Sequence, residues 1–312
     1  MPNIQGRSTS TRAAAAAAAL VCAAACTPAG AGPASDSGRP TVLTTFTVLA
    51  DMVRNVAGDR VDVESVTRVG AEIHAYQPTP EDLLRGRDAD LVLHNGLGLE
   101  AWFSQFTEPV DAPTATLSTG VETVPVVSGG HAGEPNPHAW MSPDNGLVYV
   151  DNIAAALSEL DPANADAYAA DAADYKERIR GIGEDLEADL ARLPQSQRAL
   201  VTCEGAFSYL ARDAGLTERY LWPVNADMQT TPGQVASVVE FVRANDVPTV
   251  FCETTVNSDA QQQVAEETGA ELGPDLYVDS LSKPGGPVPA YLDLLRYDTE
   301  AIAAGLTREE DA

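Results

Sequence analysis

Residues 161–193 read DPANADAYAADAADYKERIRGIGEDLEADLARL, and this stretch decides how the chain is organised. Ala, Leu, Glu, Asp, Lys and Arg fill most of it, and Pro162 suits a first helical turn. The stretch therefore predicts one long helix of about 30 residues, roughly 45 Å at about 1.5 Å per residue. Gly181 and Gly183 lower its helical propensity and leave room for a bend. Its apolar side chains form one stripe, made up of Tyr168, Tyr175, Ile179, Ile182, Leu186 and Leu190.

On both sides of this helix, short apolar runs alternate with segments of helical spacing. The predicted strands are 42–46, 61–66, 91–94, 200–203, 249–252 and 276–278. The predicted helices between them are 48–57, 81–87, 207–213, 232–245 and 258–268. Repeated strand–helix–strand order with short loops predicts parallel sheets covered by helices on both faces.

The two halves also resemble each other. The phrase TPEDL at 79–83 precedes an apolar strand, and TPGQV at 231–235 precedes another. The predicted fold class is α/β, with two similar lobes of mostly parallel sheet joined by one long backbone helix. Its predicted divisions are an N-terminal lobe at 41–160, the connecting helix at 161–193 and a C-terminal lobe at 194–312.

The N-terminus has the pattern of an export signal. Arg7 and Arg12 precede an apolar run at 13–25 that is too short to remain as a membrane-spanning helix. Ala23-Ala24-Ala25-Cys26 resembles the lipobox of bacterial lipoproteins, so we expect a lipoprotein signal peptide at 1–26 and lipidation of Cys26. The alternative is ordinary cleavage after an Ala-x-Ala site. Residues 27–40, rich in Pro, Gly, Ala and Ser, predict a flexible tether, which places the protein on the extracytoplasmic face of the cell membrane.

Charge narrows the range of partners. The chain has 312 residues and a formal net charge of −27, so nucleic acid and an anionic membrane surface would both repel it. We therefore expect contact with the membrane through the lipid anchor only. The negative charge favours solubility and weakly attracts cations.

Four side chains that can bind a metal lie at predicted strand ends or in the loops that follow: His74, His138, Glu204 and Asp279. No two of them have the i, i+4 spacing of a helical metalloprotease motif, so a shared site needs distant parts of the chain. Two imidazoles and two carboxylates form a nitrogen and oxygen site for a divalent transition metal. Taken singly, each residue could instead be a surface group, a satisfied core group or a helix cap.

Two cysteines remain after the signal segment. Cys203 and Cys252 lie in apolar, strand-like segments, and each is followed directly by a glutamate. If the two strands are adjacent, a disulfide could close a loop of about 50 residues and stabilise the fold by roughly 4 kcal/mol. The alternative is two buried free thiols. Glu253 could hydrogen-bond a ligand histidine or be a structural buried glutamate.

Several segments resemble those of the metal-receptor lipoproteins, the helical-backbone solute-binding proteins of manganese, zinc and iron ABC importers. These segments are HAYQPTP (74–80), NGLGLEAW (95–102), NPHAWMSP (136–143), TCEGAFSYL (202–210), FCE (251–253) and YVDSL (277–281). The resemblance implies that His74 and His138 bind the metal from the N-terminal lobe, and Glu204 and Asp279 from the C-terminal lobe. It further implies a monomeric receptor, not an enzyme, that delivers the ion to an ABC permease in the membrane.

The third ligand position bears on the choice of metal. Zinc receptors of this type usually have histidine where this chain has Glu204. A second carboxylate hardens the site and can raise the coordination number above the four that zinc prefers, so we expect Mn²⁺, with Zn²⁺ and Fe²⁺ as alternatives. The competing functions are an exported metalloenzyme and an adhesive lipoprotein with a structural metal. A long connecting helix predicts only a slight tilt of the lobes, or a local rearrangement of the Asp279 loop, on binding.

Overall fold

The structure, a computed structural model, describes residues 38–100, 102, 112–224 and 230–307. The predicted signal peptide, Cys26 and most of the tether lie outside the described residues. Residues 39–312 form one unit, and both lobes below belong to it. In the described part of the chain, no helix is both long enough and apolar enough to span a membrane.

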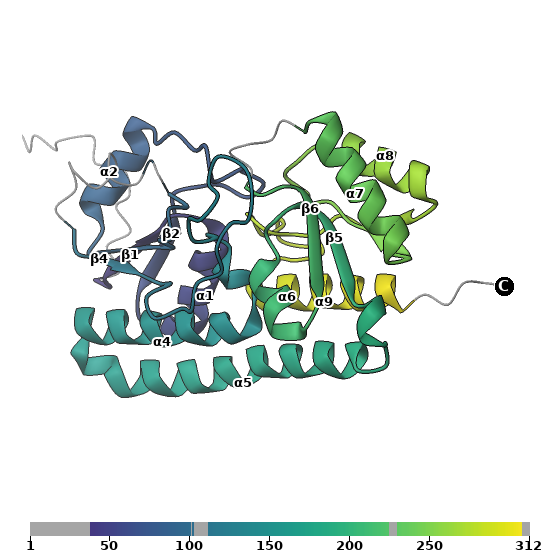
Figure 1. Ribbon diagram of the computed structural model, residues 1–312. Coiled ribbons are helices and arrows are strands. Elements are labelled where there is room, and N and C mark those ends of the chain that lie inside the picture. The colour runs from purple at the N-terminus through teal and green to yellow at the C-terminus, as the bar shows by residue number, and fades with distance from the viewer. Residues whose placement is uncertain (1–37, 101, 103–111, 225–229, 308–312) are drawn as a thin grey trace, which may run out of the picture. The chain divides into compact units, whose positions relative to one another are not determined.

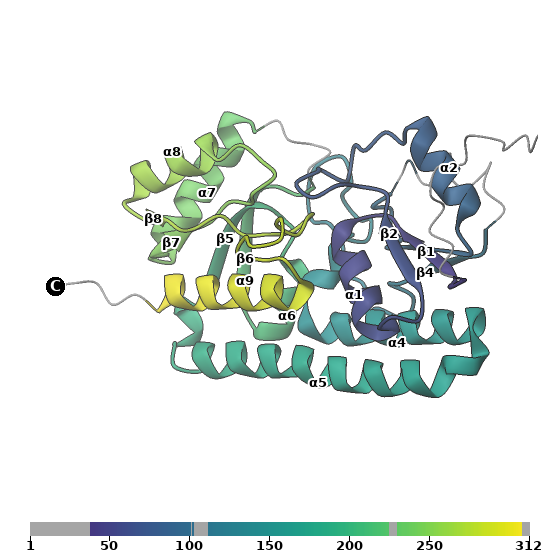
Figure 2. The same cartoon turned by 180° about the vertical axis from the view of Figure 1, so that it is seen from behind.

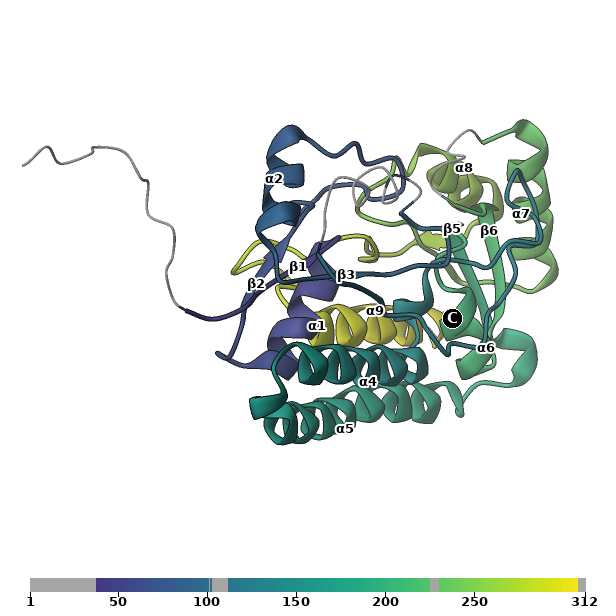
Figure 3. The same ribbon diagram turned by 90° about the vertical axis from the view of Figure 1, so that its left-hand side faces the viewer.

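The N-terminal lobe contains a fully parallel sheet in the order β2-β1-β3-β4. Its strands are β1 (Thr41–Thr44), β2 (Asp62–Ser65), β3 (Leu91–His94) and β4 (Thr114–Thr116). Its helices are α1 (Thr47–Ala57) and α2 (Pro80–Asp88). A capping box between Thr79 and Asp82 fixes the start of α2, with Pro80 in its first turn. Figure 3 shows α2 on one side of this sheet and α1 on the other.

The C-terminal lobe repeats this strand order. Its strands are β5 (Ala199–Glu204), β6 (Thr217–Trp222), β7 (Thr249–Val250) and β8 (Glu271–Leu272). The pairs β5-β6 and β7-β8 are parallel, and the Phe251 N–H donates to the Val201 carbonyl (2.8 Å), which places β7 beside β5. The order is therefore β6-β5-β7-β8. Its helices are α6 (Ser208–Ala214), α7 (Pro232–Ala244), α8 (Asp259–Thr268) and α9 (Tyr291–Leu306). The prediction of two lobes with parallel sheets and helices is confirmed.

One long helix connects the lobes. The predicted helix at 161–193 is shorter in the structure, where α5 spans Ala165–Leu190 and residues 162–164 form a separate 3₁₀ turn. Asp161 accepts hydrogen bonds from the Asn164 amide (2.6 Å) and the Tyr168 hydroxyl (3.0 Å), which explains why the turn is distinct. The predicted apolar stripe of α5 is buried and contacts α1 in one lobe and α6 and α9 in the other.

The helix α4 (Pro143–Leu160) was not singled out from the sequence. It packs along α5, as Figures 1 and 2 show. The helix α5 continues through the two glycines at which a bend was expected. A Cβ atom at Gly183 would lie 3.2 Å from the Pro143 Cβ, so this glycine lets the start of α4 approach α5 closely.

Side chains of α1 also hold the start of α9. Asp51 accepts a hydrogen bond from the Tyr291 N–H (2.8 Å), the first residue of α9, whose own N-cap residue Ala290 provides no side-chain bond. The Thr47 hydroxyl accepts from the Leu281 N–H (3.1 Å). The N-terminal lobe therefore supplies a helix cap to the C-terminal lobe.

The predicted strand at 276–278 is reduced to a single bridge between Glu253 and Leu276. The Tyr277 N–H, which points away from the bridge, donates to the Asp298 carboxylate of α9 (3.0 Å). Beyond the bridge, residues 277–281 follow an irregular path toward the other lobe, where the Leu281 N–H donates to the Thr47 hydroxyl.

The buried carboxyl group of Glu218 in β6 makes stability depend on pH. One oxygen accepts from the Ser208 hydroxyl (2.6 Å), and the other is buried with no hydrogen-bond partner among the described residues. Burial raises the pKa of this group from 4.5 to about 7. Between these pH values the folded protein keeps a proton that the unfolded chain has lost. Stability should therefore fall as pH rises through this window, by up to about 3 kcal/mol from this group.

We expect the Glu218→Gln variant to lose this part of the pH dependence. Urea unfolding of the metal-free protein at pH 5, 6, 7 and 8 would measure it as the difference between variant and wild type. Glu240→Gln, on the exposed face of α7, is the matched control and should leave the pH profile unchanged. Parallel profiles for wild type and Glu218→Gln would contradict the assignment.

Candidate metal centre

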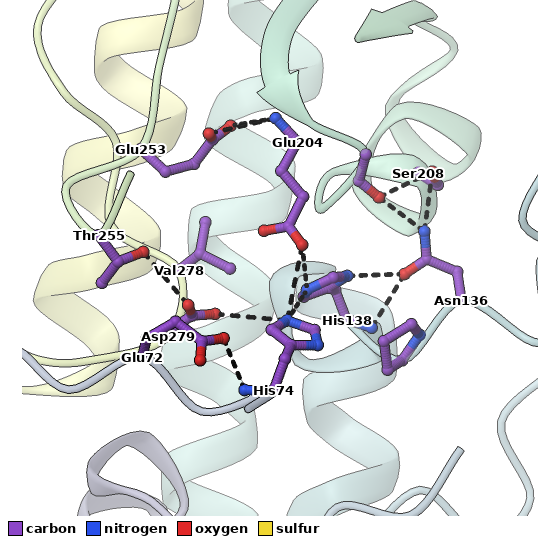
Figure 4. Close-up of polar contacts among 12 residues, drawn as sticks. Glu72, His74, Asn136, His138, Glu204, Ser208, Glu253, Thr255, Val278 and Asp279 are labelled. Carbon is purple, nitrogen blue, oxygen red and sulfur yellow. Dashed lines mark hydrogen bonds and ion pairs between the residues drawn. The ribbon is translucent and has the colours of Figure 1, made fainter. Parts of the chain in front are cut away.

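The structure brings the four sequence-predicted ligands together between the lobes (Figure 4). Glu204 is the last residue of β5, and His138 directly precedes a 3₁₀ turn at Ala139–Met141. His74 lies in the loop between β2 and α2, and Asp279 follows the bridge at Leu276. One ligand atom from each residue lies within 4.8 Å of the others.

The distances suit a single ion. The Nε2 atoms of His74 and His138 are 3.1 Å apart, and each lies 3.5 Å from Glu204 Oε1. His74 Nε2 lies 4.0 Å from Asp279 Oδ1. Ligand atoms about 2.1 Å from a metal are separated by about 3.0 Å at a right angle and about 3.4 Å at a tetrahedral angle. The two imidazoles and Glu204 therefore have the spacing of a coordination sphere, and the Asp279 oxygen lies slightly farther out, within 4.8 Å of the others.

Burial prepares the imidazoles for a cation. The side chains of His138 and Glu204 have no exposed surface, and that of His74 is 4% exposed. Burial lowers the pKa of His74 to about 3, and burial together with the charge of His74 holds the pKa of His138 well below its usual range. Both rings are therefore neutral at neutral pH, which is the form that binds a metal.

Asn136 orients His138. Its amide nitrogen donates to the Gly205 carbonyl (2.6 Å), which can only accept, so the amide oxygen must face His138. That oxygen accepts from the His138 backbone N–H (3.0 Å) and contacts its Nδ1 (2.9 Å). The proton of the neutral ring is thus placed on Nδ1, and Nε2 presents its lone pair to the site. The sequence analysis missed this role, although an asparagine two residues before a ligand histidine was a usable signal.

The carboxylate ligands are also held by neighbours. Both oxygens of Glu253 accept from the Glu204 backbone N–H (3.2 Å each). The sequence suggested a ligand histidine as the partner of Glu253, but Figure 4 shows its carboxylate directed at the Glu204 backbone nitrogen. Burial, and to a smaller extent the charge of Asp279, raise the pKa of Glu253 well above its usual range. The Thr255 hydroxyl donates to Asp279 Oδ2 (3.2 Å), a contact that the sequence did not indicate.

The other candidate residues lie around this centre. Cys203 and Cys252 form a disulfide directly beside Glu204 and Glu253, with their Cα atoms 4.8 Å apart. His94 contacts the Thr116 hydroxyl (2.9 Å), and the partly exposed His131 pairs with Glu134 (2.9 Å). Neither of these two histidines belongs to the four-ligand cluster.

Comparison with known proteins places this geometry in a family. Residues 42–305 match the family described as "Zinc-uptake complex component A periplasmic" (ZnuA). The matched range includes all four clustered residues. The chain belongs to this family. ZnuA-family proteins are metal-binding substrate-binding proteins of ABC importers, which work with a membrane permease. The protein is therefore a binding receptor and not an enzyme.

Members of the ZnuA family that are named for different metals are similar to this chain. The iron-binding protein YfeA of Yersinia pestis is 49% identical over 265 residues, which are 85% of each chain. The manganese ABC transporter substrate-binding lipoprotein PsaA of Streptococcus pneumoniae is 31% identical, over 88% of this chain and 91% of its own length. The Mn-bound periplasmic metal-binding protein of Candidatus Liberibacter asiaticus is 38% identical, with a TM-score of 0.81 over 86% of this chain and 100% of that one.

Proposed function

We propose that this receptor binds Mn²⁺ through His74, His138, Glu204 and Asp279 and delivers it to its permease. One observation carries the proposal: two neutral imidazoles and two carboxylates from both lobes converge on one buried point. Such a group of lone pairs and negative charges is costly to bury unless a cation balances it.

The choice of Mn²⁺ follows from the donor set. Oxygen donors make up half of the ligands, and either carboxylate can bind through two oxygens, which favours an ion with a high coordination number. Relatives named for manganese support this choice. Fe²⁺ is the second candidate, because the YfeA relative at 49% identity is named for iron. Zn²⁺ is the third, since a site with two carboxylates suits its tetrahedral preference least.

The location follows from the N-terminal pattern. We infer a lipid anchor at Cys26, a tether over 27–40 and a monomeric receptor on the extracytoplasmic face, with the lobes at 41–160 and 194–312 on either side of the connecting segment. Several relatives are named lipoproteins, which supports this arrangement.

Metal analysis of protein purified without chelators would test the proposal. We expect close to one equivalent of Mn²⁺, and competitive titration of the metal-free protein should rank Mn²⁺ above Fe²⁺, the latter measured without oxygen. Asp279→Ala should weaken binding at least hundredfold, because it removes a ligand, whereas exposed Asp275→Ala should not. Absence of bound metal and of any titration signal would reject the function. A preference for Fe²⁺ would make iron, in place of manganese, the metal that this receptor binds.

A further inference from the structure

Trp140 connects one ligand segment to another across the lobes. It lies two residues after His138, and its indole N–H donates to the Val278 carbonyl (3.2 Å), directly before Asp279. Its own carbonyl accepts from the Tyr291 hydroxyl of α9 (2.6 Å). The ring is fully buried, and its centroid lies 5.3 Å from that of His138. Trp140 therefore links the position of His138 to that of Asp279.

Asn136 makes the corresponding connection on the other side of His138. Its amide donates to the carbonyl of Gly205, directly after Glu204, and its backbone carbonyl accepts from the Tyr209 hydroxyl of α6 (2.7 Å). Residues 136–140 of one lobe are thus bonded to both ligand segments of the other. None of these hydrogen bonds involves the metal, so they can form before it arrives.

His74 is held in a different way. Its backbone N–H donates to Glu72, two residues earlier in the same loop (2.7 Å), and the loop reaches the other lobe through the Gly70 N–H, which donates to the Ser280 hydroxyl (2.7 Å). Within the described residues, the Nδ1 atom of the His74 ring has no hydrogen-bond partner, in contrast to that of His138. The orientation of this ring is therefore set mainly by the site itself.

We propose that residues 136–140 hold His138, Glu204 and Asp279 as a preformed three-ligand half-site, and that His74 is the ligand that closes and opens it. Asn136 and Trp140 are then positioning residues. This inference rests on the proposed function. It assigns the movement to His74 and not to the Asp279 loop that the sequence suggested, because Asp279 is fixed from the Val278 and Thr255 sides.

The first test uses metal-free protein and needs no metal to bind. Long-range ¹H–¹⁵N spectra report which imidazole nitrogen carries the proton in each of the four histidines. We expect His138 as a single Nδ1–H tautomer. Asn136→Ala should convert His138 to an average, whereas Tyr168→Phe, which removes a hydrogen bond at the start of α5, should not. An averaged His138 ring in the wild type would overturn the inference.

The second test measures release of Mn²⁺ after addition of excess chelator. His74→Ala should still bind one equivalent and release it at least a hundredfold faster, while His138→Ala should bind at least tenfold more weakly than His74→Ala. Trp140→Phe should speed release about tenfold with the His138 tautomer unchanged. If His74→Ala and His138→Ala bound Mn²⁺ with equal affinity while the wild type bound it as expected, this inference would be rejected and the proposed function would stand. A wild type that binds no Mn²⁺ would reject the proposed function and the closing role with it.

Discussion

Replacing Glu204 with histidine should shift the metal preference of this receptor toward Zn²⁺, by at least a hundredfold relative to Mn²⁺. Glu204 ends β5, and its Oε1 lies 3.5 Å from both imidazole nitrogens, so a ring at this position would enter the same coordination sphere. Three imidazoles and one carboxylate form a nitrogen-rich set of four donors, which suits tetrahedral Zn²⁺. The variant also loses one negative charge and the chance of two-oxygen binding, both of which favour Mn²⁺.

Competition between the two ions in a metal-buffered solution would measure this shift as a change in the ratio of their dissociation constants. Glu204→Gln is the matched control, because it keeps the shape of the side chain and removes only its charge. It should weaken the binding of both ions without shifting the ratio of their dissociation constants toward Zn²⁺. Glu240→His, on the exposed face of α7, should change neither constant. An unchanged ratio in Glu204→His would show that Glu204 does not determine the choice of metal.

Removing the disulfide should have the largest effect on stability. The bond joins Cys203 at the end of β5 to Cys252 just after β7, across a sequence separation of 49 residues. Closing a loop of this length restricts the unfolded chain and is worth about 4 kcal/mol. We therefore expect the double variant Cys203→Ala, Cys252→Ala to unfold at a temperature lower by roughly 10 °C, since about 1 kcal/mol shifts a domain of this size by roughly 2–4 °C.

Thermal unfolding of metal-free protein would measure this shift, with and without a thiol reductant. The reductant should lower the midpoint of the wild type and leave the double variant unchanged, so the effect of the bond is separated from that of two smaller side chains. The single variant Cys203→Ala should resemble the double variant, because one cysteine cannot form the bond. If the reductant left the unfolding midpoint of the wild type unchanged, this would argue for two free thiols.

Local sequence patterns predicted most of the fold because the residues of most helices and strands favour, by themselves, the structure that they adopt. The strand at 91–94 was predicted with the bounds that the structure shows, and the two Thr-Pro phrases mark the starts of α2 and α7 through capping boxes. The helix α4 escaped prediction because it contains Gly146, a poor helix former. A Cβ atom there would lie 2.7 Å from the Tyr291 hydroxyl, so the residue is chosen by packing between distant segments.

The ligands could be named from the sequence, but their arrangement could not. His74, His138, Glu204 and Asp279 stand in short segments that resemble those of known receptors, whereas the distances between them depend on how two lobes pack. The positioning contacts of Asn136 and Trp140 are of the same kind, since each partner is a backbone carbonyl of the other lobe. Every residue carries a backbone carbonyl, so the sequence does not show which carbonyl accepts a hydrogen bond.

Asp51 of the N-terminal lobe caps α9 of the C-terminal lobe, so the C-terminal lobe is not an independent unit. The two lobes share a strand order, which invites the view that either could be excised or exchanged as a part. An excised C-terminal lobe, however, would begin α9 without the acceptor for its first N–H, a loss worth about 1 kcal/mol for a helix start, and would expose the buried face that α9 turns toward α1. Although the lobes share a strand order, the start of α9 in one lobe depends on a side chain of the other.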